Sequence, residues 1–173
     1  WVNVAPNAKL AALKSKNIDV TTSFYNIHFI FQKVLGDDMG FLPWRDHGIN
    51  PYGNSIIANG KYLSANRATV EKFVKITQKS YADCVKTPDP CIAALVTANS
   101  GLKTGSSMKN WELVTELMSD KTSRTVALGH FNDTRMGADY KMIETYFNLA
   151  KPFDIKGAYT NAFLEKSIKF PAK

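Results

Sequence analysis

The chain has 173 residues, of which 45% are hydrophobic and 12% aromatic, a composition typical of a globular domain large enough to bury a core. No apolar run approaches the roughly 20 residues that span a bilayer, which argues against a transmembrane helix. The formal net charge of +7 would suit an anionic partner such as nucleic acid or a membrane surface. The lysines are scattered without a basic run, however, so we expect no nucleic-acid binding and interpret the charge as that of a basic secreted protein.

The first 36 residues predict two helices with a strand between them. Residues 6–16 favour a short helix, because Pro6 suits a first helical turn and leucines and alanines form a partial apolar stripe. Residues 18–22 are rich in β-branched side chains and predict a strand. Residues 27–35 form a strongly apolar helical pattern that Gly36 is expected to end.

Three residues after the predicted strand are candidate ligand contacts, because ligands of open α/β sheets bind beyond the carboxyl ends of strands. Phe24 and Tyr25 offer aromatic faces to a flat ligand, and Asn26 offers hydrogen bonds to its edge. Two alternatives stay open, namely that Phe24 packs in the core and that Asn26 caps the next helix. His28 is a lone histidine on an apolar helix, so we assign it to packing.

The stretch from Gly40 to Asn59 is the most informative part of the sequence. Short apolar runs at 41–42 and 55–58 flank a crossing rich in proline, glycine and asparagine, which predicts strand, irregular loop, strand. Polar and aromatic groups on a rigid loop between strands are typical of a binding site. The loop carries Trp44, Arg45, Asp46, His47 and Tyr52.

Each of these five side chains suits a particular contact. Trp44 and Tyr52 offer flat faces to a ligand. Arg45 suits a carboxylate, sulfonate or phosphate, and Asp46 suits an amine or ring N–H. His47 suits either the ligand or a hydrogen bond within the loop. Because neighbouring side chains on an extended chain point in opposite directions, we do not expect Arg45 and Asp46 to pair.

The second half of the sequence predicts helices that serve packing. We expect helices at residues 64 or 66 to 85, at 89–98, from 108 onward, at 123–128 and in the segment that ends before Pro152. Residues 99–107 predict a polar loop, and a last helical piece is expected after residues 159–164. Cys84 and Cys91 flank the turn between the first two of these helices. A disulfide there would join the corner and would suit an oxidising compartment, whereas two buried free thiols are the alternative. Two cysteines alone make a poor zinc site.

Three segments together resemble a known family. They are the sequence PWRDHGINPYGNSIIAN with the helix that follows near Asn66, the helix of residues 8–13 followed by a strand with Asp19, and the segment Tyr159 to Leu164. They resemble the substrate-binding proteins of ABC importers. More narrowly, they are similar to the NMT1/THI5-like family, whose branches serve thiamine-pyrimidine precursors, sulfonates and nitrate. The similarity extends over nearly all of the 173 residues.

The resemblance implies an α/β, helix-rich fold of the type II periplasmic-binding-protein kind, of which this chain is the C-terminal part of two lobes. Residues 1–50 would end the second lobe and supply cleft loops, and residues 51–173 would hold a return strand and helices that pack on the first lobe. The same protein would then have a further N-terminal portion with an export signal that is removed or absent here. The location implied is periplasmic, or extracellular and membrane-anchored.

The function implied is capture of a small molecule, pyrimidine-like or sulfonate-like and anionic, in a cleft between lobes, for delivery to an ABC permease in the membrane. The ligand contacts would be Phe24, Tyr25, Asn26, Trp44, Arg45, Asp46, His47 and Tyr52. The two-lobed fold also allows Trp44 to plug the junction of the lobes and Tyr52 to act at the hinge instead of contacting the ligand. We expect no enzyme, cofactor or metal site, because the three histidines lack metal-ligand spacing and no catalytic motif is present. The alternatives are a thiamine-pyrimidine-synthase-like enzyme that uses pyridoxal phosphate, and a non-catalytic sensor domain.

Overall fold

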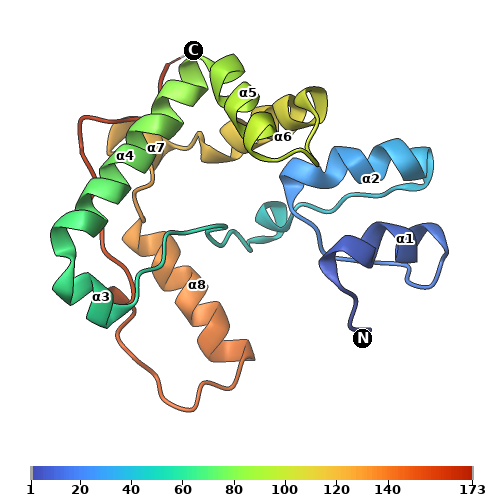
Figure 1. Cartoon of the computed structure of the whole chain (residues 1–173). Helices are drawn as coiled ribbons and strands as arrows, with labels where there is room; N and C mark the ends of the chain where they lie inside the picture. Colours follow the sequence, from blue (N-terminus) through green and yellow to red (C-terminus); the bar gives the residue numbers. More distant parts are fainter. Residues whose placement is uncertain (1, 173) are drawn as a thin grey trace. The chain divides into compact units, whose positions relative to one another are not determined.

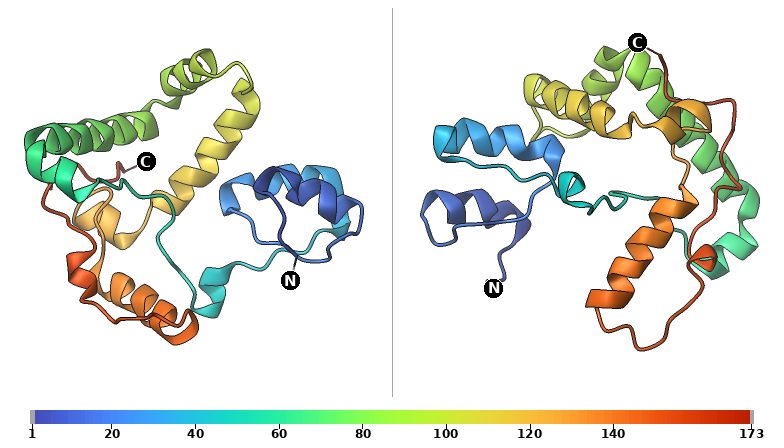
Figure 2. Two further views of the ribbon diagram at one scale, coloured as in Figure 1. Left: turned by 60° about the horizontal axis from the view of Figure 1, so that its bottom comes forward. Right: turned by 180° about the vertical axis from the view of Figure 1, so that it is seen from behind.

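The computed structural model describes residues 2–172 and divides into two compact units (Figures 1 and 2). The first unit ends at Asp46 and the second begins at His47, inside the loop that carries most of the predicted ligand contacts. Because the two units are separate bodies, each is described by itself.

The first unit contains two short α-helices and several 3-10 turns. Helices α1 and α2 contact each other. Gly36 ends α2 with a φ of 62°, a left-handed conformation that glycine adopts at low cost, so the predicted stop is confirmed. Phe31 is the buried hydrophobic residue of this unit. Its elements are η1 (Pro6–Ala8), α1 (Lys9–Lys14), η2 (Tyr25–Ile27), α2 (His28–Leu35), η3 (Gly36–Asp38) and the start of η4 (Trp44–His47).

The second unit is a set of helices bound together by the C-terminal segment. In Figure 1 the red C-terminal chain returns beside α4, and the Phe170 N–H donates to the Ser123 carbonyl at 2.8 Å. Ala82, Leu128 and Phe170 form the buried cluster at this place. The elements are α3 (Gly60–Ala65), α4 (Arg67–Lys86), α5 (Pro88–Ala98), α6 (Thr104–Met118), α7 (Lys121–Thr125), α8 (Asp133–Tyr146) and η5 (Ile155–Gly157).

A buried glutamine on α4 connects this core to two distant segments. The Gln78 Nε2 donates to the carbonyls of Leu128 at 2.9 Å and Glu165 at 3.1 Å. Its Oε1 accepts from the Glu165 N–H at 2.9 Å. A buried amide is costly unless its donors and acceptors are paired, and here both ends of the side chain have partners. Gln78 therefore fixes the C-terminal segment against α4.

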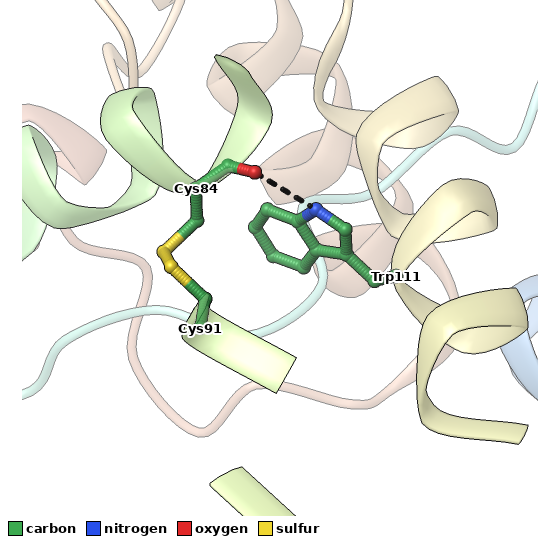
Figure 3. The surroundings of a disulfide bond; sticks show 3 residues. All are labelled: Cys84, Cys91 and Trp111. Carbon is green, nitrogen blue, oxygen red and sulfur yellow. Dashed lines mark hydrogen bonds between the residues drawn. A yellow bond between two sulfur atoms is a disulfide. The ribbon is translucent and has the colours of Figure 1, made fainter. Parts of the chain in front are cut away.

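The disulfide between Cys84 and Cys91 is present, so the alternative of free thiols is wrong (Figure 3). The bond joins the last turn of α4 to the first turn of α5, with the two Cα atoms 5.9 Å apart. Trp111 on α6 adds a third element, because its indole Nε1 donates to the Cys84 carbonyl at 3.2 Å. The corner of three helices is thus held by one covalent bond and one hydrogen bond.

The predicted strands do not form, so the α/β part of the expected fold is not confirmed, although the expected abundance of helix is. Within residues 2–172 the segments 18–22, 41–42 and 55–58 run without helix or strand. A strand needs a neighbour that pairs with its backbone, and β propensity reflects a pleated, half-buried surface. Val20 and Ile57 are instead 86% and 92% exposed. These segments are non-helical, as predicted, but no strand of the described chain lies beside them.

Several predicted boundaries also change. Helix α6 begins at Thr104 rather than Met108, because serine and glycine residues that suggest a loop are tolerated in a first helical turn. The helix predicted to begin at 64 or 66 begins at Arg67 as α4, after a separate short helix, α3, and the Asn66 side-chain amide between them donates to the Tyr62 carbonyl. After residue 157 the described chain forms turns but not the predicted last helical piece.

None of the helices within residues 2–172 combines the length and apolar composition needed to cross a membrane.

Candidate ligand-binding site

The eight predicted ligand contacts are distributed over both units. The first unit holds the segments Phe24–Asn26 and Trp44–Asp46, and the second unit holds His47 and Tyr52. Each half of the set is organised by its own neighbours.

In the first unit a cluster of three rings fixes the loop segment against the start of α2. The Tyr25 ring lies 4.8 Å from His28 and 5.7 Å from Phe41, measured between centroids. The His28 and Phe41 rings are stacked at 4.9 Å. The His28 Nδ1 also lies 2.5 Å from the Tyr25 carbonyl oxygen. The histidine is therefore a packed residue that supports Tyr25, as its apolar surroundings in the sequence predict.

The structure brings Arg45 to Tyr25 and also to its own neighbour. The guanidinium lies over the Tyr25 ring at 5.5 Å from the centroid, within the range of a cation–π contact. Its Nε is 3.8 Å from the Asp46 Oδ1, so the expectation that these two residues do not pair is wrong. The reason is that residues 44–47 form a 3-10 turn, closed by the Asp46 N–H on the Pro43 carbonyl, rather than an extended strand. Both side chains are exposed, so the pair contributes only about 0–1 kcal/mol.

Two aromatic side chains beside this cluster face solvent. Phe24 is 64% exposed and Trp44 is 52% exposed, so the alternative that Phe24 packs in the core is wrong. Asn26 lies inside η2, and the N-cap residues of η2 and α2 are Phe24 and Ile27, so Asn26 is not the cap residue of either helix. The first unit thus presents aromatic faces, a guanidinium and a carboxylate on its surface.

In the second unit Tyr52 is an anchor of the loop. Its hydroxyl accepts from the Asn132 N–H at 2.7 Å and lies 3.5 Å from the His130 carbonyl, to which it donates. Its ring makes an edge contact with Phe131 at 5.1 Å. The Arg135 guanidinium covers the ring, 4.0 Å from its centroid, so this aromatic face is already occupied.

Arg135 holds this loop in place, a role that the sequence did not reveal. From α8 its Nε donates to the Asn50 carbonyl at 2.6 Å, and its Nη2 donates to the Pro51 carbonyl at 2.9 Å and the Asn50 Oδ1 at 3.1 Å. Figure 1 shows the loop passing the beginning of α8. The residues are 85 positions apart, and an arginine in the first turn of a helix carries no signal of such a contact.

A small cavity lies between this loop and α8. Its volume is about 90 Å³, and it is lined by Gly48, Ile49, Asn50, Arg135, Ala138, Asp139 and Met142. The four α8 residues follow the spacing that places side chains on one helix face. Burial raises the pKa of Asp139 above its ordinary value, while the Tyr52 backbone N–H and the Arg135 charge act in the opposite direction. The cavity therefore contains a carboxyl group whose charged form is disfavoured by partial burial.

The segment Tyr159 to Leu164 contacts the start of α8 and the residues just before it. The Asn161 side chain pairs with both backbone groups of Phe131, accepting from its N–H at 2.8 Å and donating to its carbonyl at 2.9 Å. The Tyr159 hydroxyl donates to the Asp133 carboxylate at 2.8 Å, which raises the pKa of Tyr159. This segment holds the start of α8, and with it the place where Tyr52 is anchored.

A model of the NMT1/THI5-like family matches residues 1–91, which is more than half of the chain. The chain belongs to the NMT1/THI5-like family. No curated protein matches the sequence.

The NMT1/THI5-like match includes all eight predicted ligand contacts and the disulfide. Arg135, Asp139 and the segment Tyr159 to Leu164 lie outside it, so the similarity expected over nearly the whole chain is found over residues 1–91. The family includes substrate-binding proteins of ABC importers, and this membership supports the binding of a small molecule. Within residues 2–172 no group of three or more histidine, cysteine, aspartate or glutamate residues is placed to hold a metal ion.

Proposed function

We propose that the chain is the substrate-binding component of an ABC import system and binds a pyrimidine-like or sulfonate-like small molecule without chemical conversion. The observation that carries this proposal is that Phe24 and Trp44 of the first unit are exposed. Both lie in the family-matched part of the chain, as do Tyr25 and the Arg45 guanidinium that lies over its ring. Exposed aromatic faces can stack on a flat ligand, and a guanidinium can bind an anionic group.

The proposed capture uses the side chains according to their chemistry. Phe24 and Trp44 stack on the flat part of the ligand, and each such contact contributes about 1 kcal/mol beyond the buried area. Arg45 binds an anionic group or stacks on the ring, and Asp46 accepts from an amine. Tyr25 is held in place by His28 and Phe41, so this side of the site is ordered before a ligand arrives.

The disulfide supports a periplasmic location for the proposed binding protein. Disulfides persist in oxidising compartments and are rare where thiols are kept reduced. Cys84 and Cys91 close the corner of α4 and α5, which is part of the helical body rather than an exposed loop tip. In this location the loaded protein would deliver its ligand to a membrane permease.

Native mass spectrometry of the chain purified without denaturation tests the proposal. We expect a native mass that exceeds the denatured mass by one small molecule. Trp44→Ala and Phe24→Ala should each weaken binding of that molecule roughly five- to tenfold, which is the loss of one stacking contact. Phe147→Ala is the matched control, because Phe147 is also an exposed aromatic residue but lies outside the predicted contacts.

Two results would overturn this proposal. One is a bare chain that no aminopyrimidine or alkanesulfonate stabilises against heat. The other is a co-purified molecule with the visible absorbance of a pyridoxal phosphate Schiff base, which would indicate the enzyme alternative.

A further inference from the structure

The outer face of α4, defined by Lys72, Phe73, Ile76 and Lys79, combines exposed apolar side chains with lysines. Phe73 is 58% exposed and Ile76 is 55% exposed, and residues three apart are neighbours on the surface of a helix. Gln78 is buried and enters the core, and a residue two positions away points to nearly the opposite side of the helix. This apolar pair therefore faces away from the packing of the second unit.

The lysines of this region are scattered in the sequence but gather on one part of the fold. Lys72 and Lys79 are seven positions apart, which is nearly two full turns, so they lie on one line along α4 beside the apolar pair. Residues 60–86, which include α3 and α4, contain six basic and two acidic side chains. Their net charge of +4 is more than half of the +7 of the whole chain.

An open hollow at the edge of this face has room for an anionic group. Its volume is about 360 Å³, and it is lined by Ala68, Glu71, Lys72, Lys75 and Ile76. The Lys75 Nζ lies 3.0 Å from the Glu71 carboxylate, so this pair is neutral and Lys72 leaves the hollow with a net positive charge. A phosphate that enters the hollow meets a cation on one side and the apolar Ile76 on the other.

Three kinds of partner are distinguished by this combination of charge and apolar surface. A protein surface fits poorly, because the buried centres of protein interfaces are depleted of charged side chains such as Lys72 and Lys79. A nucleic acid would bind the lysines through its phosphates but would leave Ile76 in water. A bilayer of anionic lipids satisfies both kinds of side chain, because its phosphates lie at the surface and its acyl chains lie directly below.

We propose that the outer face of α4 docks on the surface of a membrane that contains anionic phospholipids. Phe73 and Ile76 enter the boundary between headgroups and acyl chains, while Lys72 and Lys79 extend their apolar stems along it and place their ammonium groups on lipid phosphates. The 20 residues of α4 then lie parallel to the membrane plane over about 30 Å. This peripheral contact goes beyond ligand capture and would keep the protein beside the membrane of its proposed permease.

Cosedimentation of the full chain with lipid vesicles tests the proposal. One set of vesicles contains equal parts of phosphatidylglycerol and phosphatidylcholine, and the other contains phosphatidylcholine alone. We expect saturable binding to the anionic vesicles and none to the neutral ones. Raising the salt from about 0.1 M to about 1 M shortens the screening length from about 10 Å to about 3 Å and should weaken the binding at least tenfold.

Two variants remove the two kinds of contact separately. The double variant Lys72→Gln with Lys79→Gln should bind the anionic vesicles about 25-fold more weakly, since each lysine near an anionic surface contributes about fivefold. Phe73→Ser should weaken the binding at least tenfold, because it removes the larger apolar side chain that enters the membrane. These side chains are exposed, so circular dichroism should show unchanged helix content in both variants.

Matched controls remove the same groups elsewhere on the surface. Lys103→Gln with Lys151→Gln lowers the net charge equally but leaves α4 intact, and both lysines are exposed. Phe147→Ser removes an exposed aromatic side chain of α8's C-cap position. Each control should bind the anionic vesicles within about twofold of the unmodified chain, because charges more than about 10 Å from the membrane are screened at 0.1 M salt.

Three results would overturn this inference. The first is equal binding to anionic and neutral vesicles, and the second is a Lys72 and Lys79 double variant that binds as tightly as the lysine control. The third is a chain that is dimeric in solution and becomes monomeric with Phe73→Ser, since a second copy would then cover this face. All three leave the proposed function intact, because that function is judged by the co-purified molecule and its dependence on Trp44.

Discussion

Removal of the disulfide gives the most quantitative prediction. The bond closes a loop of eight residues, counting both cysteines, because Cys84 and Cys91 are seven positions apart. The chain-entropy relation for a loop of this size gives about 2.5 kcal/mol of stabilisation at 25 °C. The double variant Cys84→Ser with Cys91→Ser should therefore lose about 2.5 kcal/mol, which corresponds to a Tm lower by roughly 5–10 °C.

Urea denaturation followed by circular dichroism measures this difference. The reduced unmodified chain is the matched control, because it lacks the bond but keeps every side chain. It should unfold like the double variant, and the double variant should be insensitive to reductant. The Trp111 hydrogen bond accepts at the Cys84 backbone carbonyl and survives in both, so it does not contribute to the difference. A double variant within about 0.5 kcal/mol of the oxidised chain would refute the reasoning, provided that denatured mass confirms the disulfide in the latter.

Three further predictions concern the contacts that hold the second unit. Gln78→Leu leaves the Glu165 N–H and the Leu128 carbonyl without their partner, so it should cost about 2–4 kcal/mol in urea denaturation, and a loss below about 0.5 kcal/mol would contradict this. Asn161→Ala frees the Phe131 backbone, so the Phe131 amide should exchange with deuterium faster while the Gln78 region keeps its protection. Because the pKa of Asp139 is raised in the folded chain, the protonated carboxyl group favours the folded state. This contribution to stability is complete below the ordinary pKa of 3.8 and is lost as the pH rises through the raised pKa of the folded chain. Asp139→Asn should therefore match the unmodified chain in Tm near pH 3 and exceed it near pH 7, and the opposite order would show that the Arg135 attraction outweighs burial.

The sequence predicted the parts of the fold that depend on local pattern. Helices α2 and α5 have apolar residues at helical spacing and clear end signals, so their extents differ from the predicted ones by about one residue. The corner disulfide was one of the two states that the sequence left open for Cys84 and Cys91, whose positions flank a single turn. The strands were not, because a strand depends on a partner that the local pattern does not specify.

The candidate site shows the same division. The aromatic and polar character of the loop followed directly from the residues between Gly40 and Asn59. The pairing of Arg45 with Asp46 could not be predicted from these residues, because it depends on the 3-10 turn that replaces an extended chain. Arg135 and Asp139 could not be found from sequence, since they meet the loop through a contact across about half the length of the protein.

The segment 55–58 has a consequence for how this protein behaves in concentrated solution. Ile56 and Ile57 are exposed, and residues 53–60 carry neither a charged side chain nor a proline. Natural proteins protect such stretches with lysine, proline or a covering element, because bare apolar backbone is a template for intermolecular β-pairing. The chain's overall positive charge opposes such association, and salt screens this charge within about 10 Å at 0.1 M. The protein should therefore become more prone to aggregation as ionic strength rises. Ile57→Lys adds a charge to this segment and should reduce the aggregation.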